Sequence, residues 1–394
     1  MLSPAPADSK SVPILPALAA MIGLQMLTIV ALLAPGVMAP RIGIDAATLG
    51  LYATAACTFG MLTTFPAGML VGRYGSFRMA TVCAVVVLCA TALSAFAGAS
   101  ALLIVAGVIL GCAYGPETPA SSAVLSRITP RELRPLVFSV RQSGNQIGAM
   151  LGSLLLPWLA AVDPAYGYTA ILLAAVAAMI AFELLRPSYD PLVRGAPAIR
   201  LRDALNVLRA SRDLQRLAIV SMPYSALQIV LNAFLVTYGV GTLGLDLVAA
   251  GLLLAIAQGG GLIGRLGFGF VATRYISAWN TLIGLGIGMS MCAGLVALAN
   301  TAWSWPLLLV LAFVFGVTAS GWNGVFLAEV ARLAPDGRVA EATGAALVPG
   351  FFGLVVGPLL VAATVGVIGL GAAYAILGVA ALAGTLVLIV GRHR

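Results

Sequence analysis

The stretch Gly68-Met-Leu-Val-Gly-Arg-Tyr74 returns later in the chain as Gly269-Phe-Val-Ala-Thr-Arg-Tyr275, and each copy closes a long apolar run. More matched positions follow at one constant offset, where Arg127, Pro130, Gly148 and Gly152 are matched by Arg332, Pro335, Gly353 and Gly357. Because the same residue types return in the same order, the chain contains a tandem duplication. Two similar halves are therefore predicted, with a central site between them.

The composition excludes a fold that is surrounded by water. Of the 394 residues, 61% are hydrophobic and only 9% are charged, which leaves too few polar side chains to cover a soluble domain. An apolar segment of roughly 20 residues can cross a hydrocarbon core of about 30 Å. Twelve such segments are predicted, near 13–38, 48–69, 78–98, 101–125, 136–161, 167–186, 217–239, 247–271, 277–299, 304–330, 342–367 and 370–391.

The segments are predicted to be helices, since a backbone in lipid must satisfy its polar groups within its own segment. The predicted fold class is an all-α membrane protein with twelve transmembrane helices in two pseudo-symmetric six-helix bundles. If both termini lie in the cytoplasm, nearly all of the 21 Lys and Arg residues fall on that side and only Arg41 lies outside, which agrees with the positive-inside rule. The net charge of +8 is therefore assigned to orientation and to anionic lipid, and nucleic acid is not an expected partner.

Residues 187–216 form the one long polar interruption. The prediction is an N-terminal bundle over 1–186, a cytoplasmic linker over 187–216 and a C-terminal bundle over 217–394. Within the linker, leucines recur at helical spacing with arginines between them, which predicts a basic amphipathic helix on the inner leaflet; a solvated linker is the alternative. The residues of this pattern are Leu201, Leu205, Leu208, Leu217, Arg202, Arg209, Arg212 and Arg216.

The segment between the second and third spans resembles the signature loop of the major facilitator superfamily. That loop reads Gly, any residue, Leu, Ala, Asp, Arg, aromatic, Gly and then basic residues. The acidic position, whose carboxylate locks the inward gate in the family, is Gly72 in the first copy and Thr273 in the second. The resemblance implies a secondary transporter that works by alternating access. The matching residues are Gly68, Leu70, Arg73, Tyr74, Gly75 and Arg78.

Shorter motifs resemble particular bacterial members of that superfamily. The stretches Arg141-Gln-Ser-Gly144 and Gly321-Trp-Asn-Gly324 look like those of cyanate-permease-like and carboxylate carriers. Gly264-Arg265 is similar to the basic position with which monocarboxylate and oxalate carriers hold the substrate carboxylate. The resemblance implies a multi-pass protein of the bacterial cell inner membrane that moves a small organic anion. No Pro follows Gly148, unlike in the drug-efflux antiporter pattern.

Three charged side chains lie deep inside the predicted spans: Glu117, Arg141 and Arg265. An ionised group at the centre of a spanning helix costs roughly 2.5–3.5 kcal/mol on insertion scales, so each needs a partner or a task. Glu117 and Arg141 have similar depths on neighbouring antiparallel spans, which makes an ion pair between them feasible. Such a pair either holds the N-terminal bundle together or carries the coupling proton when substrate competes for Arg141.

Arg265 has no acidic residue at comparable depth in its own half. It precedes the inner-face Arg274 by nine residues, which places it about 14 Å from that face at 1.5 Å per residue. A guanidinium that faces a cavity attracts an anion, and its planar fork suits a carboxylate. A structural contact with helix carbonyls or water is the alternative interpretation.

Polar side chains on several spans are further substrate-binding candidates beside Arg265 and Arg141. Interhelical hydrogen bonding or packing is the alternative for all of them. These candidates are Gln25, Gln142, Asn145, Tyr224, Gln228, Asn232, Gln258, Trp322 and Asn323. Gating candidates lie at the inner ends of the spans, and two of them are spaced for a salt bridge. They are Arg73, Arg78, Arg274, Glu329 and Arg332.

The sequence contains nothing that resembles a catalytic set. The only histidine is His393, and there is no metal-ligand cluster and no nucleotide-binding loop, so an enzyme, an ATP-driven pump, a metal and a cofactor are not expected. We predict a monomeric secondary transporter for a small organic anion, coupled to protons through Glu117. Two rival interpretations are a proton-driven multidrug efflux antiporter, in which Glu117 attracts a cation, and a membrane sensor or scaffold.

Overall fold

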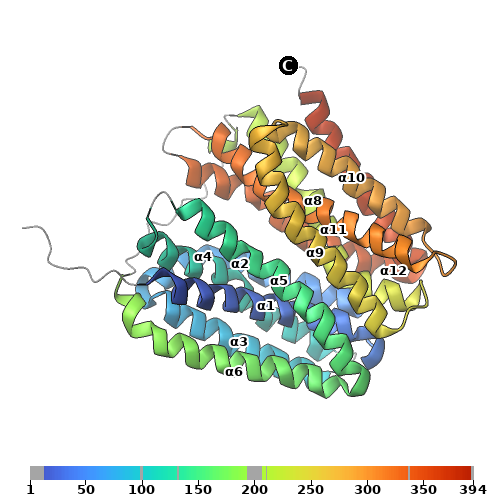
Figure 1. The fold of residues 1–394 in the computed structure, drawn as a ribbon, viewed down its shortest axis with the longest axis horizontal. Coiled ribbons are helices and arrows are strands. Elements are labelled where there is room, and N and C mark those ends of the chain that lie inside the picture. The colour runs from blue at the N-terminus through green and yellow to red at the C-terminus, as the bar shows by residue number, and fades with distance from the viewer. Residues whose placement is uncertain are drawn as a thin grey trace, which may run out of the picture.

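The computed structural model describes residues 13–97, 101–130, 133–192, 206–209, 211–335 and 338–391. Within these ranges the secondary structure is helical and contains no strand. The first half contains α1 (Ile14–Ile42), α2 (Ala46–Tyr74), α3 (Ser76–Ala97), α4 (Ala101–Ile128), α5 (Arg134–Val162), α6 (Pro164–Tyr189) and the short 3-10 helix η1 (Asp190–Leu192). The second half contains α8 (Arg212–Gly241), α9 (Leu247–Arg274), α10 (Ala278–Leu298), α11 (Trp305–Leu333) and α12 (Val339–Gly391). Figure 1 shows α1–α6 in one part of the molecule and α8–α12 in the neighbouring part.

The described helices account for all the predicted spans. Eleven of them are long and apolar enough to cross a membrane. The longest, α12, is interrupted at Gly369, where φ is 75° and ψ is 169°. Residues that carry a side chain rarely adopt such a φ. The glycine therefore lets the chain turn between two helical segments. The interruption lies between the predicted spans 342–367 and 370–391, so α12 supplies two spans, and the prediction of an all-α, multi-pass membrane protein is confirmed.

Helix ends differ from the predicted span ends, because hydropathy marks the apolar part of a helix and not its caps. α1 continues to Ile42, and α8 begins at Arg212, inside the predicted linker. There the Ser211 hydroxyl accepts a hydrogen bond from the Leu214 N–H at 3.3 Å and caps the helix. Of the predicted amphipathic helix, residues 206–209 are helical. Leu201, Arg202, Leu205 and both chain termini lie outside the described residues.

Two loops repeat one local structure at matched places in the two halves. α1 is followed by Gly43 with a φ of 72°, and α8 is followed by Gly244 with a φ of 69°. Two residues after each glycine an aspartate caps the next helix, Asp45 for α2 and Asp246 for α9, by accepting backbone hydrogen bonds at 2.7 Å and 2.9 Å. The duplication in the sequence therefore extends to loop conformation.

The molecule has two chemically different ends. One end contains the two loops in which Asp45 caps α2 and Asp246 caps α9, and it is called the acidic end. The opposite end carries arginines in the last turns of several helices and is called the basic end. Those arginines include Arg73, Arg127, Arg274 and Arg332.

The two groups of helices meet closely at the acidic end. A methyl group added at Gly36 of α1 would lie 2.5 Å from a backbone carbonyl oxygen of α8. The corresponding distance is 2.6 Å from Gly50 of α2 to α12, and 2.5 Å from Gly251 of α9 to α5. No side chain fits at such distances, so glycine allows the backbones to touch. In Figure 1, α5 and α9 lie side by side at this end and diverge toward the basic end.

α1 and α8 are the innermost helices. In their apolar windows 61% and 83% of the residues are buried, against 22% for α6. α6 instead turns large apolar side chains outward, and Leu184 is 75% exposed. An outer surface of this kind requires lipid as its solvent. Gln25 of α1 and Asn232 of α8 are accordingly buried.

Candidate functional site

A buried ion pair joins α4 and α5 in the first half. Arg141 Nη2 donates a hydrogen bond to Glu117 Oε1 at 2.8 Å, and the two side chains are 1% and 4% exposed. The same nitrogen donates to the Thr118 hydroxyl at 3.2 Å. Each charge lowers the cost of burying the other. The ion pair that the sequence made feasible is therefore present.

Gln142 extends this group to α1. Its Oε1 accepts hydrogen bonds from Arg141 Nη1 at 3.4 Å and from Gln25 Nε2 at 3.1 Å. Because a guanidinium can only donate, the contact with Arg141 fixes the orientation of both amides. Gln25 Oε1 and Arg141 Nε remain buried without a hydrogen-bond partner in the described part of the chain. Gln25, Arg141 and Gln142 thus form one connected group with spare hydrogen-bonding capacity.

Arg265 lies on α9 where this helix presses against α11. A methyl group at Gly260 or Gly264 would lie 2.3 Å or 2.4 Å from a carbonyl oxygen of α11, so these positions allow the close approach. Arg265 Nε is buried without a hydrogen-bond partner, and no salt bridge among the described residues includes the Arg265 guanidinium. The guanidinium interacts electrostatically with Tyr114 of α4. Arg265 therefore faces the first half.

Tyr114 of α4 lies near both charged groups. Its phenol lies within electrostatic reach of Glu117, Arg141 and Arg265. The ion pair and the guanidinium of Arg265 therefore border one region between α4, α5 and α9. Since Glu117 and Arg141 neutralise each other, the region carries the uncompensated positive charge of Arg265. A positive charge between low-dielectric walls attracts anions.

Amide side chains link the helices of the second half. Gln228 Nε2 donates to Ser320 Oγ at 3.3 Å, and Gln228 Oε1 accepts from Asn323 Nδ2 at 3.1 Å. Gln258 Nε2 donates to Asn232 Oδ1 at 2.8 Å. Four of the predicted substrate-binding residues thus take part in hydrogen bonds between α8, α9 and α11. This is what their alternative role, interhelical hydrogen bonding, also predicts. Their amides hold these three helices together beside Arg265.

Gln146 was missed by the sequence analysis. Its Nε2 lies 2.3 Å from the point that a methyl group on Gly261 of α9 would occupy, beside Ser320 of α11. This nitrogen is buried without a hydrogen-bond partner in the described residues. Gln146 thus brings a polar group of the first half against the second half. Its i+4 spacing from Gln142 on α5 was the available signal.

Tyr224 and Trp322 pack inside the second half. The Tyr224 hydroxyl lies 3.1 Å from the Leu282 carbonyl, to which it donates, and 2.8 Å from the Thr385 hydroxyl. The Tyr224 ring meets the edge of Trp322, which is fully buried with Nε1 unpaired among the described residues. The Tyr224 hydroxyl is therefore satisfied away from the arginines. Asn145, the remaining candidate, is half-buried on α5.

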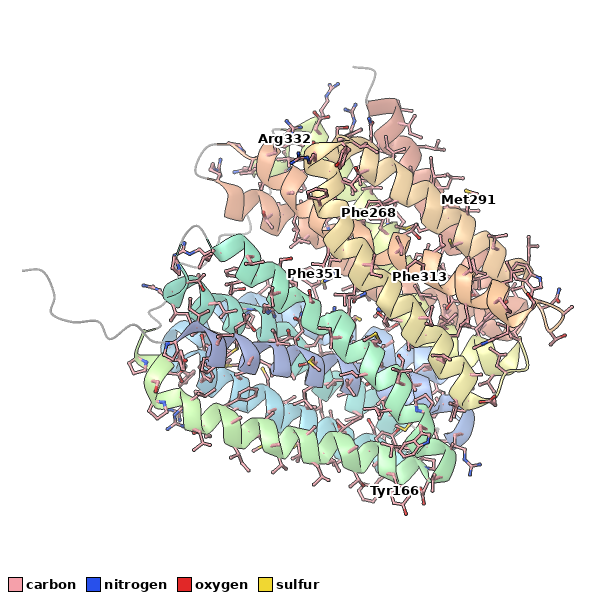
Figure 2. The ribbon with its side chains drawn as sticks, in the orientation of Figure 1. Tyr166, Phe268, Met291, Phe313, Arg332 and Phe351 are labelled. Carbon is pink, nitrogen blue, oxygen red and sulfur yellow. The ribbon has the colours of Figure 1, made fainter. Side chains whose placement is uncertain are left out.

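The predicted gating residues of the second half lie at the basic end. Arg332 donates to Glu329 from Nη2 at 2.7 Å and from Nε at 2.8 Å. The expected salt bridge is thus present, but it lies within one turn of α11 and does not join the two halves. Figure 2 shows Arg332 at the end of the second half, away from α1–α6. Arg274, at the end of α9, is exposed.

The signature loop of the first half is held by a carboxylate from elsewhere in the chain. Asp190, directly after α6, accepts hydrogen bonds from the N–H groups of Phe77 at 2.7 Å and Arg78 at 3.0 Å. Gly75 has a φ of 98°, and a methyl group there would lie 2.3 Å from the Asp190 carboxyl carbon. Arg73 and Arg78 both stack on the ring of Tyr74. The loop is therefore fixed within the first half.

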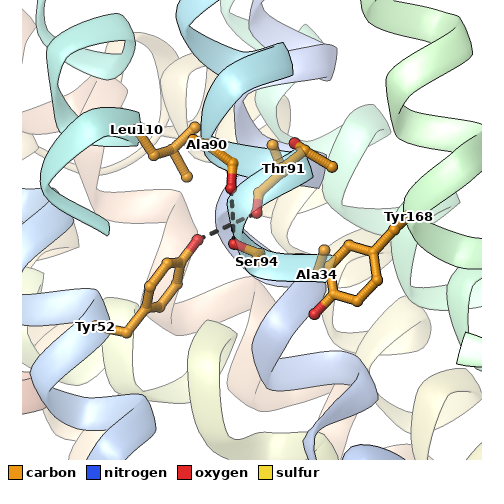
Figure 3. Close-up of a pocket in the computed structure, with 8 residues that line it drawn as sticks. Ala34, Tyr52, Ala90, Thr91, Ser94, Leu110 and Tyr168 are labelled. Carbon is orange, nitrogen blue, oxygen red and sulfur yellow. Dashed lines mark hydrogen bonds between the residues drawn. The ribbon is translucent and has the colours of Figure 1, made fainter. Parts of the chain in front are cut away.

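Two pockets lie apart from the arginines. Figure 3 shows the smaller one, which is lined mainly by Tyr52, Thr91, Ser94 and Tyr168 and is too narrow to admit a water molecule. The larger one is a groove of about 710 Å³ between α1, α5 and α6, lined only by apolar side chains. Neither pocket contains a charged residue. The two deeply placed arginines therefore lie outside both pockets.

A buried polar centre among apolar spans defines a multi-pass membrane protein of the transporter class. Residues 17–348 match the family model of the Major Facilitator Superfamily. This match covers most of the chain, and the protein therefore belongs to the major facilitator superfamily, whose members are transporters of small molecules and not enzymes. No curated protein sequence matches the chain.

Solved transporter structures share the fold over nearly their whole length. A nucleoside transporter gives a TM-score of 0.78 at 16% identity and covers 96% of this chain and 99% of its own. A bacterial homolog of the human lysosomal transporter Spinster, inward-facing and unoccupied, gives 0.72 at 15% identity, with coverages of 98% and 96%. A POT family transporter in complex with 5-aminolevulinic acid gives 0.77 at 14% identity, with coverages of 96% and 95%. At these identities the likeness establishes the fold alone. The resemblance to cyanate-permease-like and carboxylate carriers stays a prediction.

Proposed function

We propose that this protein is a secondary active transporter that moves a small organic anion with a carboxylate group across the bacterial inner membrane, coupled to protons. The observation that supports this most is the Arg265 guanidinium, which is deep within a span and has no carboxylate partner among the described residues. An unpaired guanidinium inside a membrane protein costs free energy, and a bound carboxylate recovers it through a charge-assisted, two-point contact.

Proton coupling follows from the ion pair. Arg141 uses Nη2 for Glu117, while its Nε has no partner in the described residues. A carboxylate that binds Arg141 through both Nε and Nη2 needs the nitrogen that holds Glu117, and it therefore competes with Glu117. Once Glu117 loses its partner, burial in a low dielectric favours its protonated form. The anion and a proton are thereby bound together.

The motion proposed is alternating access between two pseudo-symmetric bundles, 1–186 and 217–394, joined by the linker 187–216. The bundles touch at the acidic end, through Gly36, Gly50 and Gly251. With the basic end and both termini in the cytoplasm, as the positive-inside rule predicts, these contacts close the outer side. Rocking about the region of Arg265 opens the acidic end and brings the gating arginines of the basic end together.

The rival function of cationic drug efflux is less favoured by the charges. Glu117 is already paired with Arg141, and Arg265 adds a positive charge within electrostatic reach of the same tyrosine. Such a region repels a cation. An anion is the cargo that neutralises it.

Uptake into vesicles tests the proposal. The purified full-length protein is reconstituted, and accumulation of radiolabelled acetate, lactate and benzoate is compared with that of the cationic dye ethidium, with and without an inward proton gradient. We expect gradient-driven uptake of at least one carboxylate and none of ethidium. Ethidium transport without carboxylate transport would assign the protein to drug efflux. Absence of flux for every probe would support a sensor or scaffold instead.

A further inference from the structure

We propose, building on the anion site above, that the cargo is a hydroxylated monocarboxylate, a molecule with one carboxylate and at least one hydroxyl group. The starting observation is the location of the buried side-chain nitrogen and oxygen atoms that have no hydrogen-bond partner among the described residues. The described residues contain nine such side-chain atoms, and six of them belong to α1, α5, α9 and α11, which are the two helices that carry the arginines and two helices packed against them. The six residues are Gln25, Arg141, Gln146, Gln258, Arg265 and Trp322.

Such a concentration calls for a ligand. Buried polar atoms in folded proteins are nearly always hydrogen-bonded, because a sealed donor or acceptor has lost its water. Gln25, Arg141, Gln146 and Gln258 are each more than nine-tenths buried. These residues come from both halves of the chain. Imperfect packing between one pair of helices therefore does not account for all the missing hydrogen bonds. A polar molecule held between the halves supplies the missing partners.

The donors of this set fit a carboxylate. Arg141 Nε, Gln146 Nε2 and Arg265 Nε are unpaired N–H groups in the described structure. An ionised carboxylate only accepts hydrogen bonds and has about four lone-pair sites. One carboxylate can therefore satisfy several of these donors.

Gln25 requires something else of the ligand. Its free atom is Oε1, an acceptor, and this assignment is fixed through Gln142, whose own Oε1 must face the Arg141 guanidinium. A carboxylate cannot donate to Gln25. The ligand must therefore carry a donor of its own, and a hydroxyl is the smallest neutral group that does so. Gln258 Oε1 is a second acceptor without a partner in the described residues.

Gly144 brings α5 close to the free acceptor of Gln25. A methyl group at this position of α5 would lie 3.3 Å from Gln25 Oε1 and 3.2 Å from Ile22. These distances are tighter than an ordinary contact, so the glycine lets α5 approach Gln25, and a side chain at position 144 would crowd the free acceptor.

The charge of the region selects a single carboxylate. In the ion-paired state that an arriving cargo meets, Glu117 and Arg141 neutralise each other, so one negative charge balances Arg265. A zwitterionic amino acid is neutral overall and leaves that charge uncompensated. A hydroxylated monocarboxylate is therefore favoured over an amino acid of the same size.

Matched ligands test this inference. Binding of propionate, lactate and alanine to the purified full-length protein is measured by calorimetry; lactate differs from propionate by one hydroxyl, and alanine replaces that hydroxyl by an ammonium. We expect lactate to bind about tenfold or more tightly than either, since a site built to hydrogen-bond a hydroxyl rejects the analogue that lacks it. Gln25→Met and Gly144→Ala should each move the lactate-to-propionate ratio toward one.

Tyr168→Phe is the matched control, because the Tyr168 hydroxyl is also buried without a partner in the described residues but lies in the small pocket of Figure 3. It should leave the ratio unchanged. Equal binding of propionate and lactate to the unmodified protein would overturn the inference while leaving the anion site standing. Tighter binding of alanine than of lactate would also overturn it. Binding of none of the carboxylates would remove the proposed function and the inference together. The comparison on unmodified protein decides the matter even if a variant does not fold.

Discussion

Arg141 and Glu117 form a buried ion pair in which the guanidinium reaches the carboxylate at 2.8 Å. The pair is neutral as a unit, which has two consequences. It fixes α4 against α5 inside the first half, and it leaves Arg265 as a charge without a carboxylate partner among the described residues.

Removing one partner of this pair should be more damaging than removing both. Arg141→Met leaves Glu117 buried without its cation, and we expect the free energy of unfolding to fall by about 3–5 kcal/mol. The double variant Glu117→Gln with Arg141→Met buries no charge and should lose less. Denaturant unfolding in detergent measures the four stabilities: those of the unmodified protein, Arg141→Met, Glu117→Gln and the double variant. Losses that simply add would contradict a direct coupling between these side chains.

Asp190 and Gly75 should show a coupling of the same sign with a different cause, which is crowding. Asp190→Ala removes a helix cap of α3, worth about 1 kcal/mol. Gly75→Ala pushes a methyl group into the Asp190 carboxyl group, 2.3 Å away, and also strains a φ of 98°. In the double variant the crowding disappears and only the strain of roughly 1–2 kcal/mol and the lost cap remain. Thermal unfolding should therefore show a double variant more stable than the sum of the single losses. Simple additivity would mean that the two groups do not meet.

Gly369 should tolerate no side chain, although open space surrounds it. Its φ of 75° lies in the left-handed region, and no atom lies within 4 Å of an added methyl group. We expect Gly369→Ala to lower stability by roughly 1–2 kcal/mol through backbone strain alone. Gly366→Ala is the control, since Gly366 is equally open but helical, and alanine there should be neutral or stabilising. Equal effects of the two changes would place the chain reversal elsewhere in α12.

A larger side chain at the acidic end should shift the conformational equilibrium. Gly251→Val cannot coexist with the close contact between α9 and α5, so the halves should separate there and approach at the basic end. Spin labels at Arg73→Cys and Arg274→Cys, in a background without the native cysteines, report this as a shorter distance in pulsed electron resonance. Gly294→Val, at a position with no atom within 4 Å, should leave the distance unchanged. An unchanged distance in Gly251→Val would argue against a rocking motion.

The sequence allowed a correct prediction where a single local property, such as hydropathy or position along a helix, determines the structure. Hydropathy located the spans, and depth along two antiparallel helices anticipated the contact of Glu117 with Arg141. It could not find Asp190, because the hydrogen bond to Phe77 joins positions 113 residues apart. It also missed Gln146 and Tyr114, since which face of a helix meets a neighbour depends on packing through glycines such as Gly261. Long-range contacts of this kind leave no local pattern.

The central claim is that a negatively charged cargo binds at Arg265. Equilibrium binding of radiolabelled lactate to the purified protein tests it in three forms: unmodified, Arg265→Gln, and Arg186→Gln as a control, since Arg186 is a half-exposed arginine at the end of α6. The account predicts that Arg265→Gln weakens binding by about 10–100-fold, the loss of a charge-assisted hydrogen bond of roughly 1.5–3 kcal/mol, while Arg186→Gln binds as the unmodified protein does. Unchanged lactate affinity in a folded Arg265→Gln protein would contradict it.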